Sequence, residues 1–324
     1  MHGVPRILAI TNADAGGADE RAAADAVEVL RTSAEVEVRG TTDAADLERV
    51  LASSDGRTVV VLGGDGSLHE VVTVLRARGW LADTVVGLVP LGTGNDFARG
   101  IGIPRAPADA ARTLLTTAPR RLDLLVDDDG QVAVNAVHVG VGVDAAQEAT
   151  QLKPRFGRLG YVLGASRAGF TSPGERLTVR VDGVVVADGR QRVLQVAVGN
   201  GRYVGGGVPL TPDAVADDGL VDVVVSFAVS KPRRAAYALR VRLGRHPRSH
   251  DVRQLRGREV VVEGRAFRCN VDGELVGPTR HRTWRVEPDA WTMLAPRPGV
   301  PGPAPVPVTA SRAGPPPRPH RSAR

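Results

Sequence analysis

The chain has 324 residues, of which 42% are hydrophobic, and a formal net charge of +6. This length suffices for two ordinary domains, and the hydrophobic content is normal for a packed globular protein. No run approaches the roughly 18 consecutive apolar residues of a membrane span, and the N-terminus lacks the pattern of a signal peptide, so we expect a cytoplasmic protein. The single cysteine, Cys269, excludes an internal disulfide and is expected to be a buried apolar residue without a catalytic role.

The positive charge is concentrated in two segments. Five arginines and no acid follow Pro296, and the chain without them has a net charge of +1. The stretch 231–258 carries ten Lys or Arg against one acid, Asp251. Such a stretch can face anionic lipid headgroups or can simply be a solvated surface. We do not expect binding to nucleic acid.

Over residues 1–126, short apolar runs alternate with helical patterns, which is typical of a parallel sheet built from strand–helix–strand units. The expected strands are 7–11, 36–39, 58–62, 85–89 and 120–126, and the expected helices are 19–31, 44–52, 67–78 and 107–116. Open sheets of this kind bind ligands at the carboxyl ends of their strands.

Residues 127–295 are rich in β-branched runs separated by turn residues, which indicates a second, mainly antiparallel β domain. The expected strands are 132–139, 176–181, 184–187, 192–198, 220–227, 259–263, 266–271 and 282–286, with helices near 157–170 and 232–243. The segment 296–324 is rich in Pro and Arg and is expected to be disordered.

A buried strand ends in the glycine turn 63–67, and a helix begins there. Glycines let the backbone approach a phosphate closely, and the free N–H groups at the start of a helix attract an anion. Asp65 in this turn would repel phosphates unless Mg²⁺ lies between them. The alternative is an ordinary turn with a capping aspartate.

A second turn, residues 90–99, follows the next strand and contains Thr93, Asn95 and Asp96. Because it belongs to the same edge of the expected sheet, we predict that the two turns meet in one crevice.

These motifs, GGDGS and PLGTGNDFAR about 25 residues apart, resemble those of the diacylglycerol kinase catalytic family, in particular soluble bacterial lipid kinases related to sphingosine kinases. The resemblance reaches residue 295 or so through Asn135 and the segments 140–145, 199–207, 212–214, 218–222 and 272–274. It implies a Rossmann-like α/β nucleotide-binding domain and a β-sandwich domain, with the active site in the cleft between them.

The resemblance also implies residue roles. Glu274 corresponds to the general base, and Asp65, Asp96 and Asp123 to a carboxylate network that holds the catalytic Mg²⁺ largely through water. A structural Mg²⁺ found in some relatives would be bound here by Asp218 and the carbonyls of Val215 and Leu220. Without the resemblance, Glu274 and Asp123 would be interpreted as solvated turn acids, and an unmetallated turn at Asp218 stays open.

The implied nucleotide contacts lie in four loops. They are Asn12, Ala13, Asp14, Ala15, Gly16, Thr41, Gly63, Gly64, Asp65, Gly66, Ser67, Leu68, His69, Glu70, Gly92, Thr93, Gly94 and Asn95. The first loop lacks the proline and the hydroxyl that the family usually has there. Thr41 is equally compatible with a helix cap. The seven histidines show no metal-ligand spacing, and apart from the contact that the resemblance implies for His69, we interpret His69 and His138 as structural.

The expected function is therefore the transfer of the γ-phosphate of ATP, with Mg²⁺, to the hydroxyl of a membrane lipid such as diacylglycerol, which would give phosphatidic acid. Such an enzyme would associate peripherally with the membrane, and relatives are often homodimers. Two alternatives stay open: a kinase of another acceptor, such as a sphingoid base, ceramide, NAD or a sugar, and a regulatory nucleotide-binding module without turnover.

Overall fold

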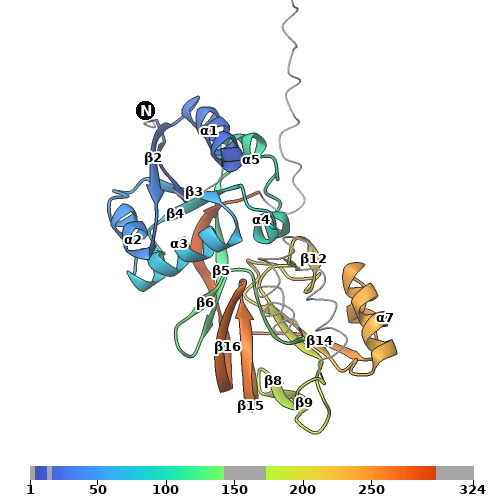
Figure 1. Ribbon diagram of the computed structural model, residues 1–324. Helices are drawn as coiled ribbons and strands as arrows, with labels where there is room; N and C mark the ends of the chain where they lie inside the picture. Colours follow the sequence, from blue (N-terminus) through green and yellow to red (C-terminus); the bar gives the residue numbers. More distant parts are fainter. Residues whose placement is uncertain (1–3, 13–16, 142–172, 297–324) are drawn as a thin grey trace, which may run out of the picture.

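The computed structural model describes residues 4–12, 17–141 and 173–296 (Figure 1). Its N-terminal part contains a parallel sheet in the order β4-β3-β1-β2, made of β1 (Arg6–Asn12), β2 (Glu35–Thr41), β3 (Thr58–Gly63) and β4 (Val85–Pro90). Strands β3 and β4 are continuous apolar runs because helices cover both faces of the sheet.

Five helices accompany this sheet: α1 (Gly17–Arg31), α2 (Ala44–Ala52), α3 (Asp65–Ala77), α4 (Asp96–Ile101) and α5 (Pro107–Thr116). Helix α1 contacts α5, and α2 contacts α3, on opposite sides of the sheet (Figure 1). Local signals set the boundaries of two helices: the Asp43 carboxylate caps α2 by accepting the Asp46 N–H at 2.8 Å, and α5 begins with Pro107. The four expected helices match α1, α2, α3 and α5 within two residues at each end, and α4 was not expected.

The expectation that the run 120–126 joins the parallel sheet is wrong. Strand β5 (Pro119–Asp127) pairs antiparallel with β16 (Glu274–Leu294) and with the short β6 (Val132–Ala133). The edge beside β4 is instead taken by the end of β16, where Thr292 and Met293 pair in parallel with Val85 and Val86. A run of apolar residues indicates burial but not its partner, so the pattern could not distinguish these pairings.

The second part is a mainly antiparallel, β-sandwich-like domain. Its strands are β7 (Ala136–Gly140), β8 (Leu177–Val181), β9 (Val184–Asp188), β10 (Gln195–Gly199), β13 (Val221–Ser226), β14 (Val252–Gly257) and β15 (Glu259–Val271), with a small hairpin of β11 (Tyr203–Val204) and β12 (Val208–Pro209). The helices are α7 (Lys231–Arg242) and the short η1 (His246–Arg248). The two runs expected at 259–263 and 266–271 form one strand with register shifts, β14 was not expected, and the helix expected near 157–170 lies outside the described residues.

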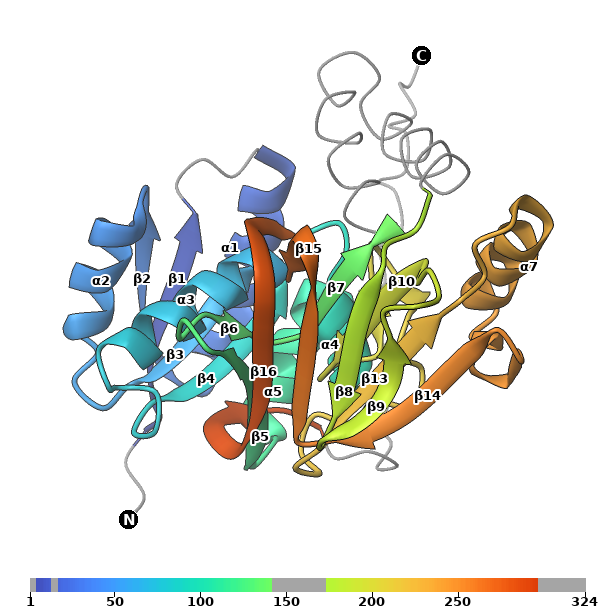
Figure 2. The ribbon, with the colours of Figure 1, turned by 90° about the horizontal axis from the view of Figure 1, so that it is seen from below.

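Strand β16 belongs to both parts of the molecule, and Figure 2 shows β15 and β16 side by side between them. Its Trp284 lies in the core of the β domain, whereas Trp291 and Met293 lie in the core of the α/β domain. The two parts therefore share one continuous 14-stranded sheet. Among the described residues, no helix could span a bilayer. Cys269 is buried as expected, and burial raises the pKa of its thiol to about 12.

Candidate active site

The two glycine turns meet, as the sequence predicts. A Cβ added to Gly92 would lie 2.8 Å from the Cα of Gly64, so only glycines allow this backbone contact. The Leu91 N–H also donates to the Gly63 carbonyl at 3.0 Å. The first turn leads into α3 and the second into α4, so the N-termini of both helices face the same region (Figure 1). The start of α3 can bind phosphates through the free N–H groups of its first turn.

Asp65 connects the two turns. Its carboxylate accepts the N–H of Asp96 at 2.9 Å and that of Phe97 at 3.0 Å, so Asp65 caps helix α4 from the other turn. Burial raises the pKa of Asp65, the two N–H donors oppose this rise, and the charge of Asp96 adds to it. The alternative interpretation, a capping aspartate, is therefore part of what Asp65 does, although it caps α4 and not its own helix.

The second carboxylate, Asp96, is 5% exposed and only half satisfied. Its Oδ2 accepts the Gly206 N–H at 2.8 Å, whereas its Oδ1 has no hydrogen-bond partner among the described residues, and the same holds for the Oδ1 of Asn95. Buried oxygens of this kind are costly unless a donor or a cation satisfies them. The described part of the chain contains no cluster of three His, Cys, Asp or Glu that could hold a metal by itself. Mg²⁺ commonly binds one or two carboxylates plus phosphates and water, so Asp65 and Asp96 fit that ion.

A hydrogen bond between His69 and Asp272, which no local sequence pattern predicts, holds the turn before Glu274 against α3. Asp272 and Gly273 form the tight turn between β15 and β16, both with positive φ, and Glu274 begins β16 with an exposed side chain. The Oδ2 of Asp272 lies 3.0 Å from the Nδ1 of His69, one helical turn after Asp65 on α3. His69 therefore links α3, the helix that follows the glycine turn 63–67, to the hairpin that carries Glu274.

Asp272 is held firmly. Besides His69, its carboxylate accepts the N–H groups of Val134, Asn135 and Ala136 at 2.6–3.0 Å, and its side chain is 2% exposed. This network fixes the turn and with it the start of β16. The sequence motif 272–274 contained the signal, but we expected a role only for Glu274.

Asp123 is placed differently from the expectation. It lies in the middle of β5, not at a strand end, and is 1% exposed. Its Oδ2 accepts the Gly219 N–H at 2.7 Å and its Oδ1 the Asp289 N–H at 2.9 Å. No hydrogen bond among the described residues joins it to Asp65 or Asp96. Asp123 thus connects β5 to the 215–220 turn and to β16, and any part in a network with the other carboxylates would require intervening water or ions.

The turn expected to bind a structural Mg²⁺ has a basic partner. One oxygen of Asp218 is paired with the guanidinium of Arg256, and the other accepts the Leu220 N–H at 3.1 Å. Arg256 also contacts Asp222 at 3.2 Å. The arginine supplies positive charge beside Asp218, where a cation was expected, and a metal bound by Asp218 with the carbonyls of Val215 and Leu220 stays a prediction.

The expected nucleotide contacts differ in what they can offer. Thr93, Gly66 and Glu70 are exposed, and Asn12 lines a cavity of about 350 Å³ beside α1. Thr41 ends β2, next to Asn12 at the end of β1. Leu68 is a correction: its side chain is 1% exposed in the core, and its N–H donates to the Gly64 carbonyl, so it has no group to offer a nucleotide. Residues 13–16 lie outside the described residues.

Two residues of the site were not expected. Gly206, in the turn between β11 and β12, brings the β domain against Asp96. Arg99 on α4 lies over the ring of Tyr203 at 5.7 Å, and its buried Nε has no partner among the described residues. The run of glycines 205–207 was the signal in the sequence: Gly207 has a φ of +107°, and a Cβ added there would lie 3.2 Å from the Cζ of Arg99.

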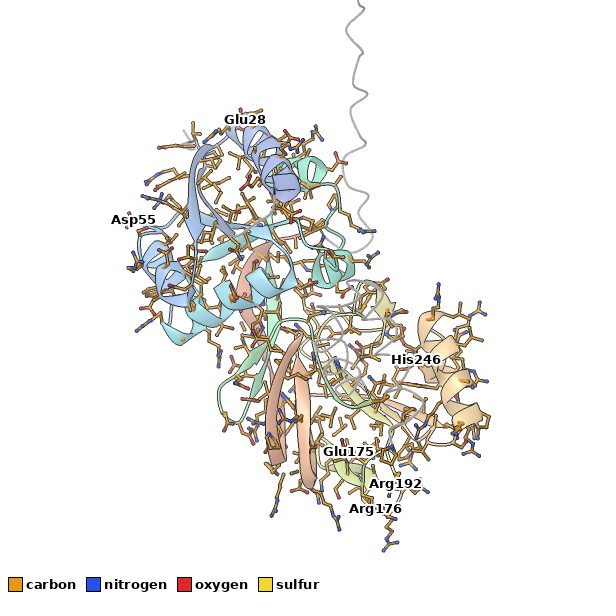
Figure 3. All side chains as sticks on the ribbon, viewed as in Figure 1. Glu28, Asp55, Glu175, Arg176, Arg192 and His246 are labelled. Carbon is orange, nitrogen blue, oxygen red and sulfur yellow. The ribbon has the colours of Figure 1, made fainter. Side chains whose placement is uncertain are left out.

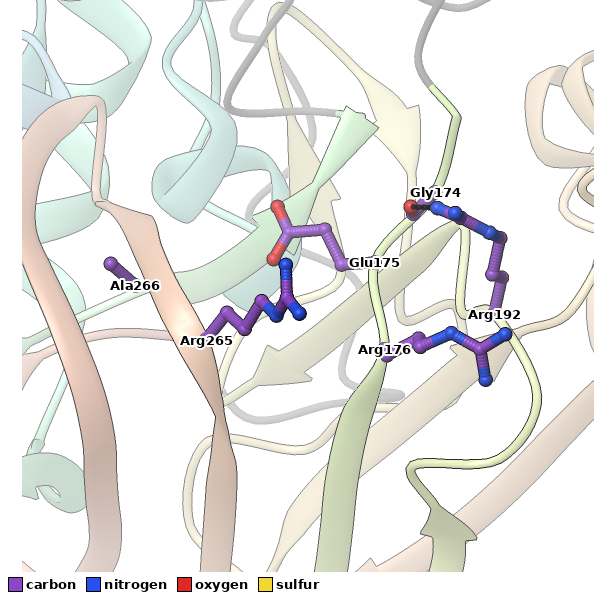
Figure 4. A pocket seen from close by; sticks show the side chains of 6 residues that line it. All are labelled: Gly174, Glu175, Arg176, Arg192, Arg265 and Ala266. Atoms are coloured by element: carbon purple, nitrogen blue, oxygen red, sulfur yellow. Dashed lines mark hydrogen bonds between the residues drawn. The ribbon is translucent and has the colours of Figure 1, made fainter.

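A cavity of about 360 Å³ lies elsewhere. Its lining consists of Gly174, Glu175, Arg176, Arg192, Arg265 and Ala266. Figure 4 shows the side chains of Glu175 and Arg265 directed toward each other, and Arg192 donates to the Gly174 carbonyl at 2.8 Å. Figure 3 places Glu175, Arg176 and Arg192 near β8 and β9, away from α3 and α4. This cavity is not part of the site around Asp65 and Asp96.

Both parts of the chain are similar to known domains. Residues 6–126 match the diacylglycerol kinase catalytic domain, and residues 135–295 match the YegS C-terminal NAD kinase beta sandwich-like domain. A protein of Stenotrophomonas maltophilia named "Probable lipid kinase YegS-like" is 34% identical over 297 residues, which are 87% of this chain and 93% of that protein. A protein of the same name from Pseudomonas putida is 35% identical over 250 residues, which are 75% and 80% of the two chains.

The fold has a counterpart among solved structures. The crystal structure of a diacylglycerol kinase from Bacillus anthracis superposes with a TM-score of 0.71 at 24% identity, over 90% of this chain and 97% of that chain. Together the two domain matches and the relatives account for nearly all of the described residues. The chain belongs to the family of YegS-like lipid kinases, with a diacylglycerol kinase catalytic domain followed by a β-sandwich-like domain.

Proposed function

We propose that the protein transfers the γ-phosphate of ATP to the hydroxyl of diacylglycerol at a membrane surface. Kinase family membership implies the use of ATP, and the name of the Bacillus anthracis relative favours diacylglycerol as the acceptor. The observation that carries the proposal is the hydrogen bond between His69 and Asp272, because it holds an exposed carboxylate, Glu274, next to the helix that follows the phosphate turn.

In this arrangement Glu274 takes the proton from the acceptor hydroxyl. Its side chain is exposed, and no hydrogen bond among the described residues occupies its oxygens, so a hydroxyl can approach within the roughly 3 Å that a general base needs. Helix α3 begins at the phosphate turn and orients the phosphate chain through its N–H groups.

Asp65, Asp96 and the orphaned Oδ1 of Asn95 would hold Mg²⁺ together with phosphate oxygens and water. When bound, this ion neutralises charge on the phosphates during transfer. Asp123 contributes here by fixing β5 and the 215–220 turn behind the site.

The direct test is to incubate the purified protein with labelled ATP and a panel of acceptors in mixed micelles. The panel contains diacylglycerol, monoacylglycerol, ceramide, a sphingoid base and NAD, with a sugar as a further soluble acceptor. We expect label in phosphatidic acid. Label only in a soluble acceptor would remove the lipid assignment, and ATP binding without any labelled product would indicate a regulatory module.

The Glu274→Gln variant tests the base. Loss of a general base lowers kcat by about 100- to 10,000-fold. The affinity for ATP should change less than about threefold, because Glu274 in this proposal contacts the acceptor hydroxyl and not ATP. Glu35→Gln, at an exposed glutamate that begins β2 as Glu274 begins β16, is the matched control. Wild-type turnover by Glu274→Gln would show that another group takes the proton.

A further inference from the structure

Helix α7 has two unlike faces. Arg234, Tyr237 and Val241 are buried and pack toward the β domain. On the outside, Leu239 and Leu243 are 61% and 56% exposed, and their spacing of four residues places them next to each other on the helix surface. Single exposed leucines are common, but an adjacent pair on one helix surface is a candidate contact region.

Cations surround this leucine pair. The exposed basic residues of α7 and the turn after it are Lys231, Arg233, Arg240, Arg242, Arg245 and Arg248. Helix α7 contains no acidic residue. Among the described ion pairs only Arg233 of these six is neutralised, by Asp251 at 3.1 Å. An apolar pair within unpaired positive charge complements an anionic bilayer, which offers both phosphates and acyl chains.

The position of α7 suits delivery of a lipid to the site. Helix α7 contacts β12, and β12 pairs with β11, which contacts α4. The turn of that hairpin donates the Gly206 N–H to Asp96. Figure 1 shows α4, β12 and α7 following one another, so one small hairpin separates the docking helix from the carboxylate pair.

We propose that the outer face of α7 docks the protein on an anionic lipid bilayer. Leu239 and Leu243 insert at the boundary between headgroups and acyl chains, and Arg240, Arg242 and Arg245 bind the lipid phosphates. This proposal rests on the proposed function, since a bilayer is where a diacylglycerol acceptor would be found. It adds which surface of the molecule meets the membrane.

Sedimentation with vesicles tests the docking charge. The full chain should bind vesicles of phosphatidylcholine and phosphatidylglycerol, bind vesicles of phosphatidylcholine alone at least tenfold more weakly, and lose affinity as salt is added. The double variant Arg240→Gln, Arg242→Gln should bind the anionic vesicles about 30-fold more weakly. The control, Arg49→Gln with Arg112→Gln, removes the same charge from exposed positions on α2 and α5 and should bind like the wild type.

Fluorescence tests the insertion. The variant Leu239→Trp should show a blue shift and quenching by brominated lipid when anionic vesicles are added. Val184→Trp, at a position 60% exposed on β9, should show neither effect. Equal signals from the two tryptophans would overturn the assignment to α7, as would vesicle binding that the two arginine substitutions leave unchanged.

Two further outcomes separate this proposal from others. Glu274→Gln should bind vesicles like the wild type, so failure of the kinase assay would leave the docking result standing. If the wild type is a dimer that dissociates on Leu239→Ala and neither form binds vesicles, α7 is an interface between copies of the chain and the docking proposal is wrong.

Discussion

The paired carboxylates Asp65 and Asp96 lie close together in a largely buried place. Because burial raises the pKa of Asp65, its contribution to stability is present at low pH and is lost as the pH rises through that raised pKa. The ionised form therefore destabilises the folded protein near neutral pH unless a cation compensates it.

Mg²⁺ should consequently raise the melting temperature near neutral pH. A ligand at about 100 times its Kd stabilises by about 2.7 kcal/mol, and this gain should shrink as the pH falls through the raised pKa of Asp65. Asp96→Asn can still accept the Gly206 N–H and should abolish most of the shift. Asp109→Asn, on the exposed surface of α5, is the control for scanning calorimetry. A shift that persists in Asp96→Asn would place the ion elsewhere.

His69 gives a second pH dependence. Burial lowers its pKa, but the hydrogen bond and the charge of Asp272 together outweigh this, so the net pKa is raised. The stability that the pair contributes is therefore complete below the unfolded pKa of about 6.5 and is lost as the pH rises through the folded pKa.

His69→Gln can still donate to Asp272 but does not titrate. The free energy of unfolding of the wild type should exceed that of His69→Gln by about 1–2 kcal/mol at low pH, and the difference should vanish at high pH. Urea unfolding at several pH values measures it. His69→Ala should in addition lower kcat more than it raises the KM for ATP, since the hairpin that carries Glu274 loses its attachment to α3. A difference that does not change with pH would mean that the pKa of His69 is the same in the folded and unfolded protein.

At the scale of elements, the two glycine turns can touch only because Gly64 and Gly92 have no side chains. An alanine at Gly92 would place its Cβ 2.8 Å from the Gly64 Cα, which is backbone and cannot rotate away. Gly92→Ala should therefore destabilise by about 1–3 kcal/mol and reduce turnover, because the turns separate.

Gly66→Ala is the informative comparison, since nothing lies within 4 Å of its added Cβ and Gly66 is inside α3. It should keep or slightly raise the melting temperature while weakening ATP binding, because the methyl group stands where phosphate approaches. Equal melting temperatures for the two variants would mean that the turns can separate without cost.

The bounds of a helix were predictable from the sequence where a residue at its start determines them. Helix α2 follows a capping aspartate and α5 starts at a proline, and both were predicted with their observed bounds. The glycine turns and their meeting were predictable too, because parallel strands end at one edge. The bond between His69 and Asp272 was not, since it joins residues 203 positions apart and depends on how the two domains dock. The pairing of Asp123 with the 215–220 turn was missed for the same reason.

At the scale of the whole molecule, the expected boundary near residue 126 does not separate two independent cores. Strand β16 has 21 residues, and its two tryptophans lie in different cores. Only its run 282–286 was expected to be a strand, because register shifts and exposed residues interrupt the alternation in the rest. The β domain thus contributes the edge strand beside β4, and the α/β domain lacks that strand without it.

This shared strand predicts one unfolding transition for the whole chain. Val60→Ala in the first core and Val262→Ala in the second each remove two buried carbons and should each destabilise by about 1–3 kcal/mol. If the cores are coupled through β16, both variants lower the same transition, and far-ultraviolet circular dichroism and tryptophan fluorescence report one midpoint in urea. Trp291→Phe, which loses the Nε1 donor to the Asp123 carbonyl at 3.1 Å, should lower that midpoint as well. Two separable transitions, each shifted by only one of the valine substitutions, would show that the domains fold independently and that β16 merely crosses between them.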